Sequence, residues 1–313
     1  MRRYTQSIAL LVLAGVLIPV PGILGRSLSA EAQEINAEAD LESLRKDAIT
    51  GSPQSQFRLG TAYAEGRLIE KDDAEAVAWF RKSAEQGLPE AQNALAWMYY
   101  KGEGVEENLA EAADWFRKSA DQGRAEAQYL LGEMYSTALG VPLDHAAALD
   151  WYRKAGEQGY VEAQLHLAWL YSAGKGVTQD AAESVKWYRR AAEQGNAEAQ
   201  FRMGQIYSNG MGVTKDEAEG VKWFRMSADQ GSPEGQAGLG WMYYKGRGVP
   251  QDAVMGYMLF ILSGEGGVEG ALDMLPTMAA SMTPEQVAEA ESRAAECQSK
   301  NQPDKSPEAE SGR

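Results

Sequence analysis

Residues 159–194 read GYVEAQLHLAWLYSAGKGVTQDAAESVKWYRRAAEQ, and this 36-residue stretch decides the fold because its pattern occurs six times without insertion. Glycine opens each unit and follows the last one, at Gly51, Gly87, Gly123, Gly159, Gly195, Gly231 and Gly267. With glycine at about 7% of an average sequence, six further matches to the first position have a chance probability of about one in ten million. Such a period is typical of repeat proteins, in which each unit buries its apolar face only against its neighbours.

The first half of each unit predicts a helix, which we call helix A. Leu59, Gly60 and Tyr63 have the i, i+1, i+4 spacing of one helical face, and the small residue lets a neighbouring helix approach closely. Two columns recur in this helix, at Tyr63, Tyr99, Tyr135, Tyr171, Tyr207 and Tyr243 and at Gln56, Gln92, Gln128, Gln164, Gln200 and Gln236. A glycine such as Gly66 ends the helix in a left-handed conformation. The third repeat carries Ala138 there, which leaves the form of its turn open.

The second half of each unit predicts another helix, helix B. A capping side chain marks its start, as at Asp72 with Glu75 three residues on. Tryptophan recurs at Trp79, Trp115, Trp151, Trp187 and Trp223, and each is followed by Phe or Tyr. Basic pairs such as Arg81-Lys82 lie near the C-terminal end, where the helix dipole favours positive charge. Each unit is therefore predicted to be a helix-turn-helix, and the chain an all-α solenoid.

The unit from Gly159 to Gln194 has the form G-x-x-x-A-Q-x-x-L-A-x-x-Y-x-x-G-x-G-V-x-x-D, closes in W-Y-R-R-A-A-E-Q, and resembles the Sel1-like repeat, a relative of the tetratricopeptide repeat. The resemblance covers residues 51–266 as the units 51–86, 87–122, 123–158, 159–194, 195–230 and 231–266. It implies an α-α superhelix whose concave side is lined by helix A. It also implies a non-catalytic scaffold that binds a partner protein in envelope signalling or assembly.

The segments on either side of the repeats predict caps and a tail. We expect an N-terminal capping helix over residues 36–50 and C-terminal capping helices over 267–298. From 299 to 313, Pro, Ser, Glu and Lys dominate, which predicts a disordered tail.

The side of helix A opposite the predicted core holds the candidate groove residues. With Leu59 as reference, a helical wheel places Gln54, Phe57, Arg58, Thr61, Ala64 and Glu65 there. Ligand-contacting positions of tetratricopeptide domains fall on all of these except Arg58. This agreement is implied by the family resemblance and does not come from the helical wheel. The aromatic residues of this side define the predicted partner-binding groove: Phe57, Trp97, Tyr100, Tyr129, Trp169, Phe201, Trp241 and Tyr244.

One groove column alternates between tryptophan and other residues. Trp97, Trp169 and Trp241 occupy it in every second repeat, so no packing rule common to all repeats requires them. Two interpretations stay open: the indoles pack against the next helix A, or they are exposed in the groove, where Trp and Tyr dominate the energy of peptide binding. The first predicted partner is a protein or peptide. The alternative is peptidoglycan or an exopolysaccharide, because aromatic faces also stack on sugar rings.

The N-terminus has the pattern of a secretory signal peptide over residues 1–32. Arg2 and Arg3 precede an apolar run from Ile8 to Ile18, and an A-x-A sequence predicts cleavage between Ala32 and Gln33. An uncleaved anchor is the competing interpretation, but the run is shorter than the ~20 apolar residues that a spanning helix needs. We therefore expect a periplasmic or secreted protein without a stable membrane span after cleavage.

Charge and composition disfavour several other functions. The net charge is −15, and −17 without residues 1–32, which argues against a nucleic-acid partner. Neither His145 nor His166 has acidic or cysteine neighbours at metal-ligand spacing, so no metal and no cofactor are expected. The one match to an enzyme motif, Ser43-Leu44-Arg45-Lys46, lacks its supporting elements. Cys297 is the only cysteine, so stability must come from packing.

Overall fold

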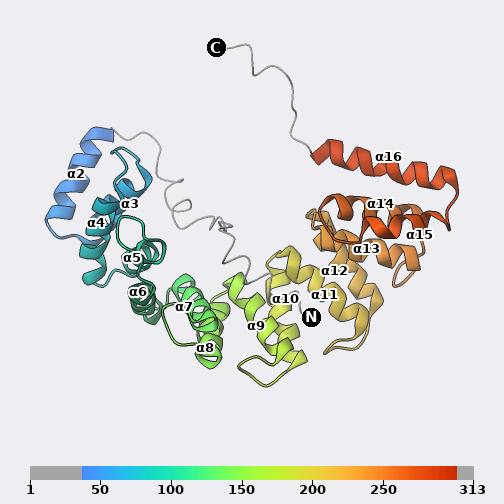
Figure 1. Ribbon diagram of the computed structural model, residues 1–313, viewed down its shortest axis with the longest axis horizontal. Coiled ribbons are helices and arrows are strands. Elements are labelled where there is room, and N and C mark those ends of the chain that lie inside the picture. Colours follow the sequence, from blue (N-terminus) through green and yellow to red (C-terminus); the bar gives the residue numbers. More distant parts are fainter. Residues whose placement is uncertain (1–36, 302–313) are drawn as a thin grey trace, which may run out of the picture. The chain divides into compact units, whose positions relative to one another are not determined.

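The computed structural model describes residues 37–301, with side chains from 40 to 299. These residues form α-helices and one short 3-10 helix, with no strand among them (Figure 1). The predicted all-α architecture is confirmed. The predicted signal peptide lies outside the described residues, and so does residue 302 onward of the predicted tail.

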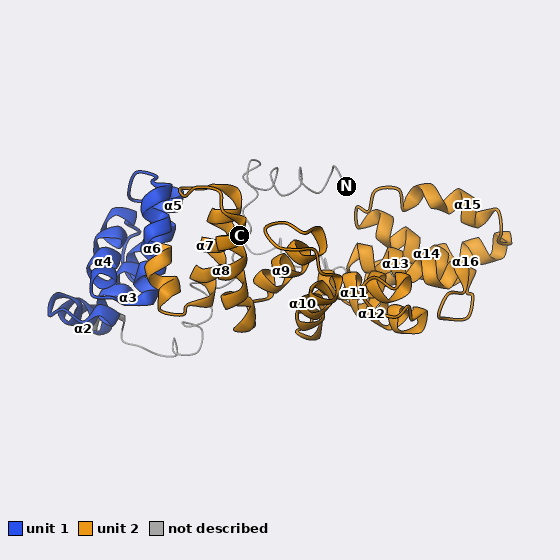
Figure 2. Cartoon of the chain, turned by 90° about the horizontal axis from the view of Figure 1, so that it is seen from below, with its two compact units in different colours: residues 1–115 blue, residues 116–313 orange. Residues whose placement is uncertain are grey.

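The chain divides into two compact units, residues 1–115 and residues 116–313, which are coloured separately in Figure 2. Unit 1 holds α2 (Ala37–Ile49), α3 (Pro53–Glu65), α4 (Asp73–Glu85) and α5 (Pro89–Lys101). Helix α6 (Leu109–Asp121) begins in unit 1 and ends in unit 2. Unit 2 continues with α7 (Ala125–Thr137), α8 (His145–Glu157), α9 (Val161–Ala173), α10 (Ala181–Glu193), α11 (Ala197–Asn209), α12 (Glu217–Asp229), α13 (Pro233–Lys245) and α14 (Ala253–Glu265). Odd-numbered helices from α3 to α13 are A helices, and even-numbered helices from α4 to α14 are B helices.

The C-terminal cap consists of η1 (Leu272–Met274), α15 (Leu275–Ala279) and α16 (Pro284–Asn301). Helix α16 packs on α14, and α2 packs on α3 at the other end of the chain. One boundary differs from the prediction, because α16 continues to Asn301 and so includes the first three residues of the expected tail. Ala290 and Ala294 hold this helix on the core of the last repeat, where both are buried.

Helix ends follow the predicted capping chemistry. The carboxylate of Asp72 accepts hydrogen bonds from the backbone N–H groups of Ala74 and Glu75, and Asp144 and Asp180 cap their helices in the same way. The A helices end at a residue in the left-handed conformation, including Ala138 with φ 60°. The third repeat therefore makes the same turn as the others, at the cost of an alanine in a region that glycine adopts more easily.

Close contact between the two helices of a repeat explains the small residue of helix A. A Cβ atom on Gly132 would lie 2.8 Å from the ring of Tyr152, so the aromatic residue of helix B rests directly on the glycine backbone. Tyr152 and Leu131 are fully buried beside it. The predicted close approach is confirmed, and the aromatic residue after the tryptophan is buried in every such repeat except the fourth, where Tyr188 is half-buried.

Arginines of helix B bind the recurring tyrosines of the following repeat. The Arg153 guanidinium donates to the Tyr171 hydroxyl at 3.0 Å, and Arg117 donates to Tyr135 at 2.9 Å. The same bond, 18 residues apart in sequence, joins Arg81 to Tyr99, Arg189 to Tyr207 and Arg225 to Tyr243. The tyrosine column therefore links successive repeats through its hydroxyl as well as through its ring.

Candidate functional site

The eight predicted groove residues lie on A helices, and their side chains are all half-buried. Unit 1 holds Phe57 on α3 and Trp97 and Tyr100 on α5. Unit 2 holds Tyr129 on α7, Trp169 on α9, Phe201 on α11, and Trp241 and Tyr244 on α13. We call the five residues of unit 2 the helix-A face of that unit.

Half-burial of these side chains reflects the general crowding of the A helices. In α13 only Glu234 and Lys245 are exposed. The preceding B helix, α12, exposes Ala218, Lys222, Arg225, Met226 and Asp229. The A helices are thus covered by neighbours on more of their circumference, which is the environment expected on the inner side of a repeat stack.

Trp169 and Trp241 are neither fully buried nor fully exposed. Trp169 packs against the core around Leu167, and Trp241 packs against the core around Leu239. Neither ring is enclosed, because both side chains keep intermediate exposure. Each indole therefore packs against the core while part of its surface stays accessible.

A lysine lies over each of these tryptophans. In unit 2, the ammonium of Lys175 is 4.9 Å from the Trp169 ring centre, and that of Lys245 is 4.9 Å from Trp241 and 4.5 Å from Tyr244. In unit 1, Lys101 lies 5.6 Å from Trp97. Cation–π contacts of this kind hold the lysine beside the ring. The result is a composite of aromatic surface and positive charge, repeated at alternate A helices.

A polar cluster occupies the helix-A face between these positions, in the third and fourth repeats. Glu133 stands where the second, fourth and sixth repeats have tryptophan, and its carboxylate accepts a hydrogen bond from the Tyr152 hydroxyl. The same carboxylate oxygen is 3.3 Å from His166 Nε2. The His166 ring stacks on Tyr152 with centres 5.2 Å apart and lies 5.6 Å from the Tyr129 ring. Glu133 is thus anchored inside unit 2 rather than presented as a free charge.

The two tyrosines of this cluster, Tyr129 and Tyr152, have raised pKa values. Burial, reinforced by the Glu133 charge, raises the pKa of Tyr129 and of Tyr152 well above the ordinary value of about 10. Both hydroxyls are consequently neutral and able to donate a hydrogen bond at neutral pH. Sequence spacing could not reveal the cluster, because Glu133 and His166 lie on different helices and are 33 residues apart.

The described residues contain no group of three or more His, Cys, Asp and Glu side chains arranged to hold a metal ion. Within that part of the chain, no helix is both long and apolar enough to cross a membrane. The chemistry of the helix-A face is therefore that of rings, hydroxyls and lysines, which bind ligands through contact area, hydrogen bonds and charge.

Paired helices of 13 residues, stacked through glutamine, arginine and tyrosine contacts, define a helical-repeat protein. The family model of the Sel1 repeat matches six consecutive stretches, at residues 53–88, 89–123, 125–160, 161–196, 197–232 and 233–268. The chain belongs to the Sel1 repeat family, whose members are typically protein-interaction scaffolds. The family frame starts about two residues after the predicted one, close to the start of each helix A.

Solved structures of relatives show the same architecture. A protective antigen of uropathogenic Escherichia coli strains, which displays an SLR fold, is 37% identical with a TM-score of 0.76 over 83% of this chain. The chain spans only 57% of the length of that antigen. A Sel1 repeat protein from Oxalobacter formigenes is 30% identical with a TM-score of 0.60, over 74% of this chain and 100% of its own. No curated protein matches the chain.

Proposed function

We propose that this protein is a non-catalytic adaptor that holds an extended or helical segment of a partner protein against its A helices. The observation that carries the proposal is the pair Trp169 and Trp241 in unit 2. Both are half-buried, both stand at the same position of their helix, and the fold does not require either, since Glu133 and Gln205 occupy that position in other repeats. Anchored aromatic side chains bind with little loss of conformational freedom, which makes them effective contacts for a peptide.

The lysines favour a protein segment over the alternative, an envelope glycan. Lys175 and Lys245 already lie over the indoles, so a sugar ring would have to displace an ammonium group before it could stack on that face. A peptide can instead contact the free edges of the rings, and its carbonyl or carboxylate oxygens can accept hydrogen bonds from the lysines. Affinity electrophoresis against peptidoglycan and exopolysaccharides distinguishes the two: retardation that disappears in Trp169→Ala would support the glycan instead.

Unit 1 carries a smaller version of the same surface. The ring centres of Trp97 and Tyr100 are 5.3 Å apart in an edge-to-face arrangement, next to Lys101. We propose that this unit makes its own contact with the partner. Its contribution is tested separately with Trp97→Ala.

The compartment is also a proposal, supported by the pattern of residues 1–32. We propose export to the periplasm or beyond, with a role in envelope signalling or assembly. Mass determination of the N-terminus after expression in a Gram-negative host tests it. A mature chain that begins at Gln33 is expected, whereas a retained Met1 in the cytoplasmic fraction would contradict export.

Capture from an envelope extract tests the adaptor function. The full chain is used as bait, as wild type and with Trp169→Ala, Trp241→Ala or both. Trp151→Ala is the matched control, because Trp151 is also half-buried with a lysine, Lys154, 3.6 Å from its ring, but lies on a B helix. We expect one dominant partner that the control retains and the double variant loses. Equal recovery by a folded double variant would refute the assignment to the A helices.

A further inference from the structure

In several repeats, the side-chain amide of the helix-A glutamine makes two hydrogen bonds, and we call this recurring arrangement the glutamine ladder. In unit 2, Gln164 Nε2 donates to the Gly156 carbonyl at 2.9 Å, and Gln164 Oε1 accepts from Gln194 Nε2 at 2.8 Å. The pairs Gln128 with Gln158 and Gln200 with Gln230 repeat this geometry at 2.7 and 2.6 Å, and unit 1 has it at Gln56 with Gln86. An amide on helix A is thus bound by a second amide from the end of helix B, 30 residues later.

The ladder is interrupted in the last repeat. The residue 30 positions after Gln236 is Gly266, so no second amide is available. Among the described residues, the Gln236 side chain has no hydrogen-bond partner, and it is half-buried where the four doubly bonded glutamines are buried. Gln236 therefore presents both its donor and its acceptor.

Backbone conformation does not require the glycine at position 266. Its φ of −71° is close to the −80° of Gln194, which any residue adopts. A Cβ atom on Gly266, however, would lie 2.4 Å from Cγ of Pro233. In this repeat the proline at the start of α13 therefore lies directly against position 266, whereas the first repeat accommodates both Pro53 and Gln86 at the same two positions.

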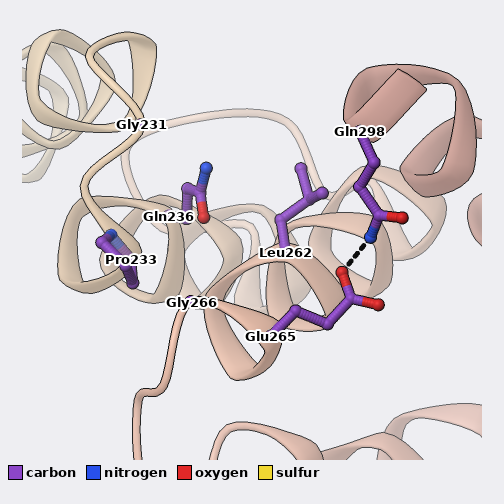
Figure 3. A pocket seen from close by; sticks show the side chains of 7 residues that line it. All are labelled: Gly231, Pro233, Gln236, Leu262, Glu265, Gly266 and Gln298. Carbon is purple, nitrogen blue, oxygen red and sulfur yellow. Dashed lines mark hydrogen bonds between the residues drawn. The ribbon is translucent and has the colours of Figure 1, made fainter. Parts of the chain in front are cut away.

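A cavity of about 280 Å³ lies beside Gln236 (Figure 3). Pro233 and Leu262 supply apolar wall, and Gly231 and Gly266 supply backbone. Helix α16 closes one side with Gln298, whose Nε2 donates to the Glu265 carboxylate across the cavity rim. The volume is many times the ~30 Å³ of one water molecule and suits a single side chain.

We propose that this cavity binds a primary carboxamide, the side chain of a glutamine or asparagine in a peptide. The carboxamide would take the place that Gln194 takes on Gln164, with its N–H donating to Gln236 Oε1. Its oxygen would also accept from Gln236 Nε2, the donor that Gln164 directs to the Gly156 carbonyl. Pro233 and Leu262 contact the methylene groups. Glu265 disfavours a carboxylate by charge repulsion, which separates glutamine from glutamate. This site is distinct from the helix-A face and does not depend on the adaptor proposal.

Chemical shifts of the Gln236 side-chain amide test the proposal on the uniformly ¹⁵N-labelled full chain. The probe is an acetyl-Ala-Gln-Ala N-methylamide peptide, compared with the Glu and Met analogues and with free L-glutamine. We expect saturable shifts with a Kd on the order of 1 mM for the glutamine peptide. If free glutamine binds with equal affinity, the site recognises the same carboxamide group, but its ligand is the free amino acid rather than a peptide.

Two variants separate binding from stability. Both are followed through the backbone amide shifts of the lining residues Gly231 and Gly266. Gln236→Ala should weaken binding at least about tenfold, because two neutral hydrogen bonds are lost. Gln200→Ala, which disrupts the ladder one repeat earlier, should keep the affinity within about twofold. Equal binding of the Glu or Met peptide, unchanged binding by Gln236→Ala, or no saturation up to about 50 mM peptide would overturn the proposal.

The chain itself contains a competing amide, because Gln302 follows the described residues. Gln302→Ala is therefore titrated in parallel, and sedimentation velocity of the free protein reports any association between copies. Binding that appears only in Gln302→Ala would assign the cavity to the chain's own C-terminus and overturn an external ligand. If the free protein self-associates and Gln236→Ala abolishes that association, the cavity binds an amide of a second copy of the chain, and the proposal of an external ligand is overturned.

Discussion

The A and B helices of unit 2 both carry tryptophans with a cation over the ring, but only the B-helix set follows the repeat. On the B helices, Trp151 lies under Lys154 and Trp187 under Arg190. Trp187 and Trp223 are buried there, at 5% and 8% exposure, whereas Trp151 is half-buried. On the A helices, Trp169 and Trp241 are half-buried and alternate with Glu133 and Gln205. Recurrence rather than burial therefore separates the two sets, and a tryptophan that departs from the repeat identifies a surface whose role the fold does not explain.

The largest effect is expected in the free energy of unfolding when a B-helix tryptophan and an A-helix tryptophan are each replaced by alanine. Trp223→Ala removes a buried side chain and should lower the free energy of unfolding by about 3–5 kcal/mol. Trp241→Ala removes a half-buried one and should cost roughly 1–2 kcal/mol. Urea unfolding followed by circular dichroism gives both values. Equal losses would show that Trp241 is a packing residue like Trp223.

Alkaline pH tests the polar cluster that takes the place of tryptophan at Glu133. The pKa values of Tyr129 and Tyr152 are raised in the folded protein, so folding favours their protonated forms. Their stabilising contribution is full below about pH 10, the unfolded value, and is lost as the pH rises above it. In that range, each tyrosine lowers the free energy of unfolding by up to about 1.4 kcal/mol per pH unit, because it loses its proton more readily in the unfolded state.

The control for this prediction comes from other repeats. Tyr129→Phe with Tyr152→Phe introduces the residues that stand at the same positions of the first and fifth repeats: Phe57 and Phe80, and Phe201 and Phe224. Urea midpoints measured from pH 8 to 11 should fall more steeply for wild type than for the double variant. Parallel curves would mean that these hydroxyls do not contribute to the alkaline loss.

The glutamine ladder gives a smaller difference between interior repeats and the last one. Gln164→Ala leaves the carbonyl of the buried Gly156 without its side-chain donor and removes the acceptor of the Gln194 amide, and it should cost about 1–2 kcal/mol. Gln236→Ala breaks no side-chain hydrogen bond among the described residues and should change stability by less than about 0.5 kcal/mol. Thermal and urea unfolding of the two variants measure this difference. Equal destabilisation of both would contradict the interruption of the glutamine ladder at Gln236.

The helical repeat could be predicted from the sequence because a fixed period is visible without any distance information. Caps such as Asp72 and turns such as Gly66 are local, so they were also predictable. The Arg153–Tyr171 bond was not predicted because it depends on how one repeat docks on the next, and the Gln164–Gln194 bond was not predicted because it depends on how the two helices of one repeat pack. Their constant offsets of 18 and 30 residues were nevertheless a signal that two columns are neighbours.

The candidate site was less predictable than the fold. A helical wheel placed Trp169 and Trp241 opposite the core of their own repeat, but their exposure depends on the neighbouring helices, which a wheel omits. The bonds between Glu133, Tyr152 and His166 arise from three helices and have no counterpart in the other repeats. A side chain that occurs in one repeat only leaves no periodic trace, so structure was needed to find it.

Site-specific photocrosslinking tests the central claim that the A helices bind the partner. Benzoylphenylalanine replaces Trp169 or Trp241 in the full chain, with replacement of Trp151 on the B helix as the matched control, and the cells are irradiated before the envelope is extracted. We predict a covalent adduct to the same partner protein from positions 169 and 241 and none from position 151. An adduct from position 151 with none from the two A-helix positions would contradict the account.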